Sequence, residues 1–164
     1  MSDVTLSADE LLAWSDTTAE HWKRLIEAHP EALQLPCDIA GVRTAGELLQ
    51  HIVAAELRLA ERLQGAGTVT SPEEISYDSA EAIYRTHDRA SSLFRQLLAD
   101  KGYDWSEQLE FNTRTGKIAA PRKVILFHAL LHGIRHYAQL ATVMRQNGIK
   151  PDWPMDYLFM AGRS

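Results

Sequence analysis

Residues 121–148 read PRKVILFHALLHGIRHYAQLATVMRQNG, and three histidines recur in this stretch at intervals of four: His128, His132 and His136. On an α-helix, residues four apart lie on one face, about 6 Å apart along the axis. For seven histidines in 164 residues, chance gives roughly 0.3 pairs at this spacing and about 0.01 runs of three. The run therefore indicates a row of imidazoles along one side of a helix.

Apolar residues such as Ile125, Leu126 and Leu140 flank the row, so we expect it to face the core or a cavity. A buried imidazole needs a partner for each ring nitrogen. A hydrogen-bonded core histidine is the ordinary interpretation of any one of them, whereas a shared metal ion satisfies several at once. A further histidine, His51, lies in the helix-patterned segment AGELLQHIVAAELRLAERL (45–63). Two imidazoles from one helix and one from another predict a three-nitrogen metal site. The spacing does not decide which histidines of the row bind the metal.

Neutral imidazoles suit Zn²⁺, Ni²⁺ or related divalent ions. A site with three protein ligands keeps a position open for water or substrate, as catalytic sites do. There the pKa of a bound water falls toward neutrality, and a bound thiol becomes a thiolate. The pattern therefore indicates a divalent metal ion as the cofactor, and zinc and nickel are the ions that we expect most.

Hydrophobic periodicity predicts four long helices, over about residues 7–29, 44–64, 79–100 and 121–147. Thr44 and Glu47 have the spacing of a capping box at the start of the second helix. The most economical architecture is an all-α, up-and-down four-helix bundle that forms a single domain over residues 1–164.

Two smaller elements are also expected. A short hairpin can pair Leu109–Asn112 with Lys117–Ala119. The tail, DWPMDYLFMAG, is expected to form a short C-terminal helix whose residues 157–160 pack on the bundle or on a second subunit.

Composition and charge exclude several classes of protein. The formal net charge of −5 disfavours nucleic-acid binding, which needs a basic face. The uncharged apolar stretches are far shorter than the ~18 residues of a membrane span, and the acidic N-terminus lacks the pattern of a secretory signal. The single cysteine, Cys37, suits a reducing compartment, so we expect a cytoplasmic protein.

Some polar residues allow two interpretations. A group of cations before the histidine row is either solvated surface or the rim of a pocket that attracts an anionic substrate; it comprises Arg114, Lys117, Arg122 and Lys123. Glu56 lies five residues from His51, a poor fit to the same helical face, so a surface ion pair is favoured over a role beside the metal. Tyr84 and His87 on the third helix either reach the cavity or lie outside it, and for an isolated histidine beside Asp88 the solvated position is the usual one.

The segment HALLHGIRHYAQLATVMRQNGIKP resembles the last-helix signature of DinB-like proteins. In that signature, H-x-x-x-H-G-x-x-H precedes a small residue, Gln and a Leu/Arg-rich run that ends in Gly. The segment around His51 matches the family's first ligand-bearing helix, and PDWPMDYLF resembles its C-terminal segment. Arg135 stands where a second adjacent His is common. The resemblance extends over most of the chain and is specific at five positions: His51, His132, His136, Gln139 and Gly148.

The resemblance implies a four-helix bundle, often dimeric, with one divalent metal ion. His51, His132 and His136 would be its ligands, with His128 a turn away, and His128 or Gln139 would orient a ligand or the nucleophile. Relatives in the wider superfamily include thiol transferases and a thiol-dependent isomerase, and many members are described as hydrolases. We therefore expect an enzyme that activates water or a low-molecular-weight thiol, with no catalytic base yet identified. The alternative is a non-catalytic, metal-binding, stress-associated homodimer.

Overall fold

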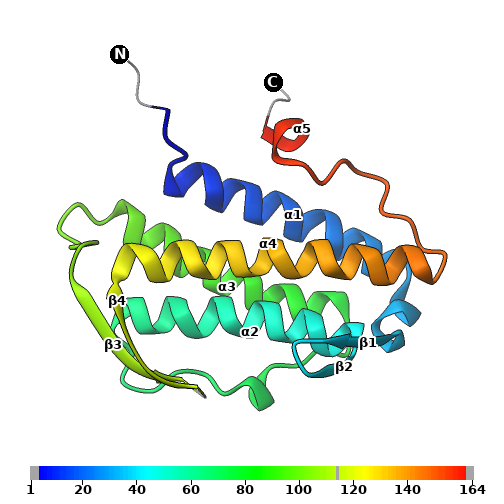
Figure 1. The fold of residues 1–164 in the computed structure, drawn as a ribbon, viewed down its shortest axis with the longest axis horizontal. Coiled ribbons are helices and arrows are strands. Elements are labelled where there is room, and N and C mark those ends of the chain that lie inside the picture. The colour runs from blue at the N-terminus through cyan, green and yellow to red at the C-terminus, as the bar shows by residue number, and fades with distance from the viewer. Residues whose placement is uncertain (1–3, 114, 162–164) are drawn as a thin grey trace.

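The computed structural model describes residues 4–113 and 115–161, and this part of the chain is mostly helical (Figure 1). The expectation of a largely helical protein is confirmed, and each long helix lies within one residue of its predicted bounds. Two small antiparallel sheets, each with two strands, accompany the helices. The helices are α1 (Ala8–Ala28), α2 (Ala45–Gln64), α3 (Ala80–Ala99), α4 (Arg122–Gln146) and the short α5 (Tyr157–Ala161).

The starts of α1 and α2 are capped differently. At α1, the Ser7 hydroxyl accepts from the backbone N–H of Glu10, and the Glu10 carboxylate accepts from that of Ser7, which completes a capping box. At α2, Thr44 accepts from the backbone N–H of Glu47 at 3.2 Å. The Glu47 carboxylate, however, binds the backbone N–H and the guanidinium of Arg43. The predicted capping box is therefore only half formed, because Arg43 offers Glu47 a charge-assisted pair of donors.

The expectation of a strictly up-and-down order is wrong, because α2 and α3 run in the same direction (Figure 1). Near the start of α2, the Gln50 amide donates to the carbonyls of Pro72 and Ile75, just before α3. Near the end of α2, the Leu63 carbonyl accepts from Tyr103, just after α3. The connection over residues 65–79 makes this possible. When extended it can span roughly 50 Å, and a 20-residue helix is only about 30 Å long.

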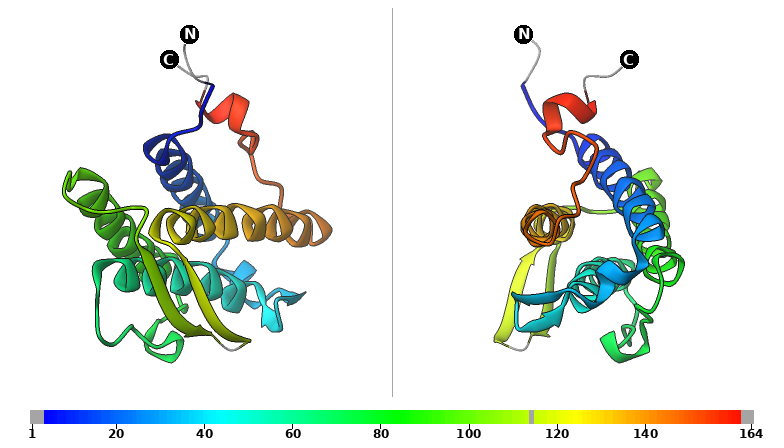
Figure 2. Two further views of the ribbon diagram at one scale, coloured as in Figure 1. Left: turned by 60° about the vertical axis from the view of Figure 1, so that its left-hand side comes forward. Right: turned by 90° about the vertical axis from the view of Figure 1, so that its right-hand side faces the viewer.

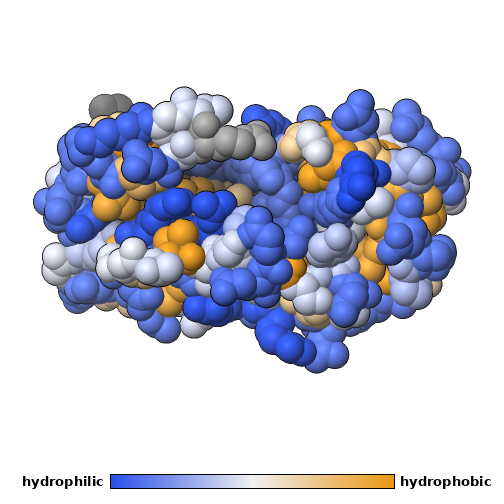
Figure 3. All heavy atoms as spheres, turned by 90° about the horizontal axis from the view of Figure 1, so that it is seen from below, coloured by the Kyte–Doolittle hydropathy of each residue, from blue (hydrophilic) through white to orange (hydrophobic). Residues whose placement is uncertain are grey.

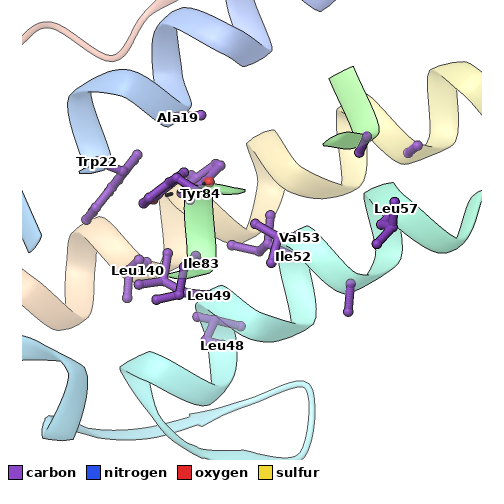
Figure 4. Packing of buried hydrophobic residues seen from close by; sticks show 14 of the residues in the cluster. Ala19, Trp22, Leu48, Leu49, Ile52, Val53, Leu57, Ile83, Tyr84 and Leu140 are labelled. Atoms are coloured by element: carbon purple, nitrogen blue, oxygen red, sulfur yellow. Dashed lines mark hydrogen bonds between the residues drawn. The ribbon is translucent and has the colours of Figure 1, made fainter. Parts of the chain in front are cut away.

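Each long helix packs closely on two others: α2 contacts α3 and α4, and α1 contacts the same two helices. Leu49, Ile83 and Leu140 come from α2, α3 and α4 and fill the space between these helices (Figure 4). On the other side of the core, the Trp22 ring of α1 stacks on the Tyr137 ring of α4, with centroids 5.6 Å apart. These contacts fix α4 between α1 and α2.

The predicted hairpin is present and is longer than expected: β3 (Gln108–Thr113) pairs with β4 (Gly116–Pro121), with Leu109 opposite Ala120. A second hairpin, β1 (Pro36–Ile39) with β2 (Val42–Thr44), was not predicted. Its two turn residues, Ala40 and Gly41, have φ angles of 56° and 79°, as a two-residue hairpin turn requires. Strands this short leave almost no alternating pattern in the sequence.

The tail packs on α1 and also exposes apolar side chains. The Trp14 indole N–H donates to the sulfur of Met160 at 3.2 Å, and its ring meets Tyr157 edge-on. Figure 2 shows α5 beside the N-terminal half of α1. Leu158 and Phe159 on the same helix remain 72% and 51% exposed. One side of α5 therefore packs on α1 of the same chain, and the other side is exposed.

On the face seen from below, small apolar areas lie apart among hydrophilic residues (Figure 3). Within the described residues, every helix is too short or too polar to cross a membrane.

Candidate metal centre

Three histidines from two helices lie together between α2 and α4. His51, His132 and His136 each offer one ring nitrogen, and these nitrogens all lie within 4.8 Å of one another. The Nε2 atoms of His51 and His132 are 3.1 Å apart. The ring centroids of His132 and His136 are 4.5 Å apart. The structure thus brings together the three residues that the resemblance singled out.

The absence of a side chain at Gly133 lets α4 approach α2 beside this cluster. A Cβ atom at Gly133 would lie 2.9 Å from Oε1 of Glu56 and 3.5 Å from Cγ2 of Ile52. The first distance is shorter than a carbon–oxygen contact allows, so any larger residue would force the helices or Glu56 to shift. The glycine that follows His132 in the sequence therefore leaves room for the buried Glu56 carboxylate between α2 and α4, beside the histidine cluster.

The histidine row does not face inward along its whole length. His128 is exposed, His132 is half-buried and His136 is buried. A step of four residues exceeds a full helical turn by about 40°, so the row rotates around α4 as it advances. His128 therefore does not face the core; it lines a cavity instead, the other outcome expected for the row, and its ring centroid lies 5.7 Å from that of His132.

The environment favours neutral imidazoles in the cluster. Burial, and then the nearby His136, His51, His128 and Arg135, together lower the pKa of His132 to about 3. Burial also lowers the pKa of His136, against the hydrogen bond to Gln139. Neutral rings retain the nitrogen lone pairs that a metal ion requires.

Gln139 fixes the orientation of one ring. Its side-chain oxygen lies 2.7 Å from Nδ1 of His136, so this nitrogen carries the proton and donates it to the amide. The Nε2 lone pair of His136 is then directed away from Gln139, toward the guanidinium of Arg135 at 3.2 Å. Such an oriented imidazole is the usual arrangement for a metal-binding histidine.

The donor set fits a divalent cation. Within the described residues, nothing hydrogen-bonds the buried Nδ1 atom of His132. The Nε2 atom of the same ring faces Nε2 of His51 at 3.1 Å, so Nε2 is the His132 nitrogen that a shared ion would use. Three neutral imidazoles without an adjacent thiolate could hold a metal ion of intermediate softness.

Glu56 and His87 form a buried network that the sequence analysis placed wrongly. Glu56 is 1% exposed and His87 is 4% exposed. The two ring nitrogens of His87 lie 2.8 Å from the Glu56 carboxylate and 3.1 Å from the Asp16 carboxylate. Asp16 also accepts from Ser91 and pairs with Arg95. A surface pair for Glu56 and a solvated His87 are both wrong, because the partners come from helices distant in sequence.

Burial alone lowers the pKa of His87, but the Glu56 charge and the hydrogen bonds to Asp16 and Glu56 outweigh it and raise the pKa to about 10. His87 is therefore an imidazolium held between two carboxylates, and it connects α1, α2 and α3. The sequence signal that could have indicated this network is that Glu56 falls on the apolar stripe of α2, four residues from both Ile52 and Ala60.

Two of the cations near the start of α4 form ion pairs. Lys117 pairs with Glu110 across the β3–β4 hairpin. Arg122 pairs with Glu107 and lies over the Tyr103 ring. Arg114 lies outside the described residues. Lys117 and Lys123 are therefore exposed surface cations, whereas the Arg122 side chain is only 21% exposed.

A pocket of about 490 Å³ begins one helical turn from the cluster. Ala55, four residues after His51, lies in one wall, and His128, four residues before His132, lies in another. The β3–β4 hairpin closes the far side. This volume is large enough for a small organic molecule.

A sequence model of the DinB family matches residues 1–162. A comparison with curated proteins finds no match.

The buried imidazolium predicts a specific dependence of stability on pH. His87 holds its proton more tightly in the folded chain, with a pKa of about 10 against 6.5 for an unperturbed histidine. Its stabilising effect should be complete below pH 6.5 and lost as the pH rises through 10. We expect His87→Gln to lower the free energy of unfolding by about 3 kcal/mol at pH 6.5, and the difference should shrink toward pH 10.

Urea unfolding at pH 6.5, 8 and 9.5 measures this difference. His29→Gln is the control, because His29 is an exposed histidine paired with an exposed glutamate and should cost less than about 0.5 kcal/mol. A difference between wild type and His87→Gln that stays constant over this range would contradict the assignment.

Proposed function

The chain belongs to the DinB family, and we propose on this basis that it is a metal-dependent enzyme whose divalent ion is held by His51, His132 and His136. One observation supports the proposal most strongly: three imidazole nitrogens from two helices converge within 4.8 Å. Neither helix alone can supply such a set, because the row on α4 rotates away from the site at His128. Zinc and nickel are the ions that best match the three nitrogens.

A divalent ion in such a site lowers the pKa of a bound water or thiol, which makes it a nucleophile at neutral pH. We propose that the enzyme uses this nucleophile as a hydrolase or as a thiol S-transferase. Gln139 holds the His136 ring in the tautomer that leaves Nε2 unprotonated. His128 lies exposed between the cluster and the pocket, where it can position a nucleophile or exchange a proton with it.

The adjacent pocket favours an enzyme over the non-catalytic alternative. A purely structural site needs no cavity, whereas an enzyme needs space for its substrate next to the reacting atoms. The pocket of about 490 Å³ shares His128 with the histidine row. A small molecule bound there would lie one turn from the ligands on each of the two helices.

Other parts of the proposal concern assembly and location. We propose that residues 1–164 form one domain and that two copies associate as a homodimer, since Leu158 and Phe159 leave an apolar edge on α5. We propose that the four long helices form the four-helix bundle of the family, in which α2 and α3 run parallel as described above. We also propose a cytoplasmic protein without a nucleic-acid partner, in keeping with its net charge of −5. The stress-associated dimer without activity remains the alternative to the enzyme.

The ligand assignment predicts which variants lose metal. Wild-type protein that has been loaded with zinc or nickel and desalted should retain one ion per chain by elemental analysis. His51→Ala and His132→Ala should lose this stoichiometric metal, because two imidazoles then remain. His128→Ala is the matched control and should retain it. If His128→Ala loses the ion and His136→Ala keeps it, the wrong pair on α4 has been chosen.

The enzyme proposal predicts turnover that depends on the bound ion. We expect the zinc- or nickel-loaded protein to act either on a panel of chromogenic esters or on a chromogenic electrophile supplied with low-molecular-weight thiols. The rate should exceed that of chelated protein and of His132→Ala by at least about 100-fold, since metal activation contributes several kcal/mol. Inactivity across both panels, with the metal bound, would favour the non-catalytic alternative.

A further inference from the structure

Two arginines line the pocket beside the histidine cluster, and we propose that Arg58 and Arg62 bind the carboxylate of a small organic anion there. The body of this ligand is apolar and extends toward His128. The proposal deepens the proposed function, because it names the substrate class of the same site. Binding of the anion itself requires only the pocket.

The pocket lies between α2, α4 and the β3–β4 hairpin. On α2 its wall is formed by Ala55, Arg58, Leu59 and Arg62, which share one helical face. Residues from the other two elements complete it: the apolar Phe111, Ile118, Ala120, Val124 and Ile125, and the polar Asn112, Thr113, Thr115 and His128. The cavity is therefore a largely apolar space with two guanidinium groups in one wall.

Arg58 has unused hydrogen-bonding capacity. Its Nε atom is buried, and no described residue accepts a hydrogen bond from it. A buried N–H group of a charged side chain is costly to leave without a partner. Of the acids nearby, Glu73 is influenced by the Arg58 charge, but its carboxylate is exposed and bound to Ser71. The described residues therefore leave the Arg58 guanidinium incompletely satisfied, and in our proposal a carboxylate in the pocket binds this group.

Arg62 adds a second positive charge to the same wall. Its guanidinium lies over the Phe111 ring at 4.5 Å from the centroid, which leaves the N–H edge available for a planar anion. Burial, and then the charge of Arg58, lower the pKa of Arg62, so the two guanidinium groups repel each other. An anion between them would relieve this repulsion.

Glu61 is the acid whose charge acts on this wall, since it raises the pKa of Arg62 against burial and Arg58. The Glu61 carboxylate lies between the two arginines in sequence, but it binds Thr70 and Arg89. Among the described residues that line the pocket, none is acidic. The local charge is therefore positive in a protein whose formal net charge is −5.

The chemistry of the walls favours a carboxylate with an apolar body. A guanidinium matches the planar, two-oxygen geometry of a carboxylate, and the apolar side chains suit an aliphatic or aromatic group. Arg58 lies seven residues beyond His51, or about 10 Å along the α2 axis. A ligand of this length, bound to Arg58 by one end, places its other end near the histidines. We infer that the substrate carries its reactive group at the end opposite the carboxylate.

The test compares a carboxylate with its neutral isostere. Titration calorimetry on the full-length, zinc-loaded chain uses 4-phenylbutyrate and 4-phenylbutyramide, and we expect the carboxylate to bind at least about tenfold more tightly. Arg58→Gln and Arg62→Gln should each reduce this preference, and the double variant should abolish it. Arg58→Lys should keep part of it. Arg85→Gln is the matched control, because Arg85 forms an exposed pair with Glu81 on α3 and should leave the preference unchanged.

Repeating the titration with chelator separates this proposal from the proposed function. Anion preference that persists without metal, and disappears in the double variant, supports the arginine site even if the chain proves inactive. The proposal would be overturned if wild type binds neither compound or binds the acid and the amide equally. It would also be overturned if the preference for the acid survives in the double variant or requires the metal. The wild-type comparison needs no substitution, so a variant that fails to fold does not prevent the test.

Discussion

The close approach of α2 and α4 at Gly133 is the constraint on which the histidine cluster depends. The ring nitrogens of His51, His132 and His136 lie within 4.8 Å of one another where these helices meet, and a Cβ atom at Gly133 would lie 2.9 Å from the Glu56 carboxylate beside them. Glu56 lies against the same glycine and is held by His87, whose other nitrogen binds Asp16 on α1. The contact that brings the ligands together is thus supported from α1 and α3 by a buried ionic network.

Histidines with opposite protonation behaviour lie on the two sides of α2. In the cluster, burial and neighbouring positive or titratable groups favour the neutral ring, and the pKa of His132 falls to about 3. In the network, two carboxylates overcome burial and keep His87 charged, with a pKa of about 10. Residue type alone therefore does not decide the role of a histidine here. The charges that the other helices bring to each ring decide it.

Local patterns in the sequence were sufficient to predict the four long helices and the β3–β4 hairpin, because caps, stops and periodicity are short-range signals. The family motif singled out the same three histidines that converge in the structure. Features that depend on contacts between distant segments could not be predicted. The parallel course of α2 and α3 follows from how residues 65–79 run back along α2, and the Glu56–His87 pair joins residues 31 positions apart. The rotation of the histidine row could have been anticipated, since it follows from helix geometry alone.

X-ray absorption spectroscopy of the zinc-loaded protein tests the central claim most directly. If His51, His132 and His136 hold the ion, the spectrum should show three imidazole nitrogens at about 2.0–2.1 Å and additional oxygen from water. The spectrum of His128→Ala should be the same. Fewer than two imidazoles at the zinc, or sulfur at about 2.3 Å from Cys37, would contradict a shared site between α2 and α4.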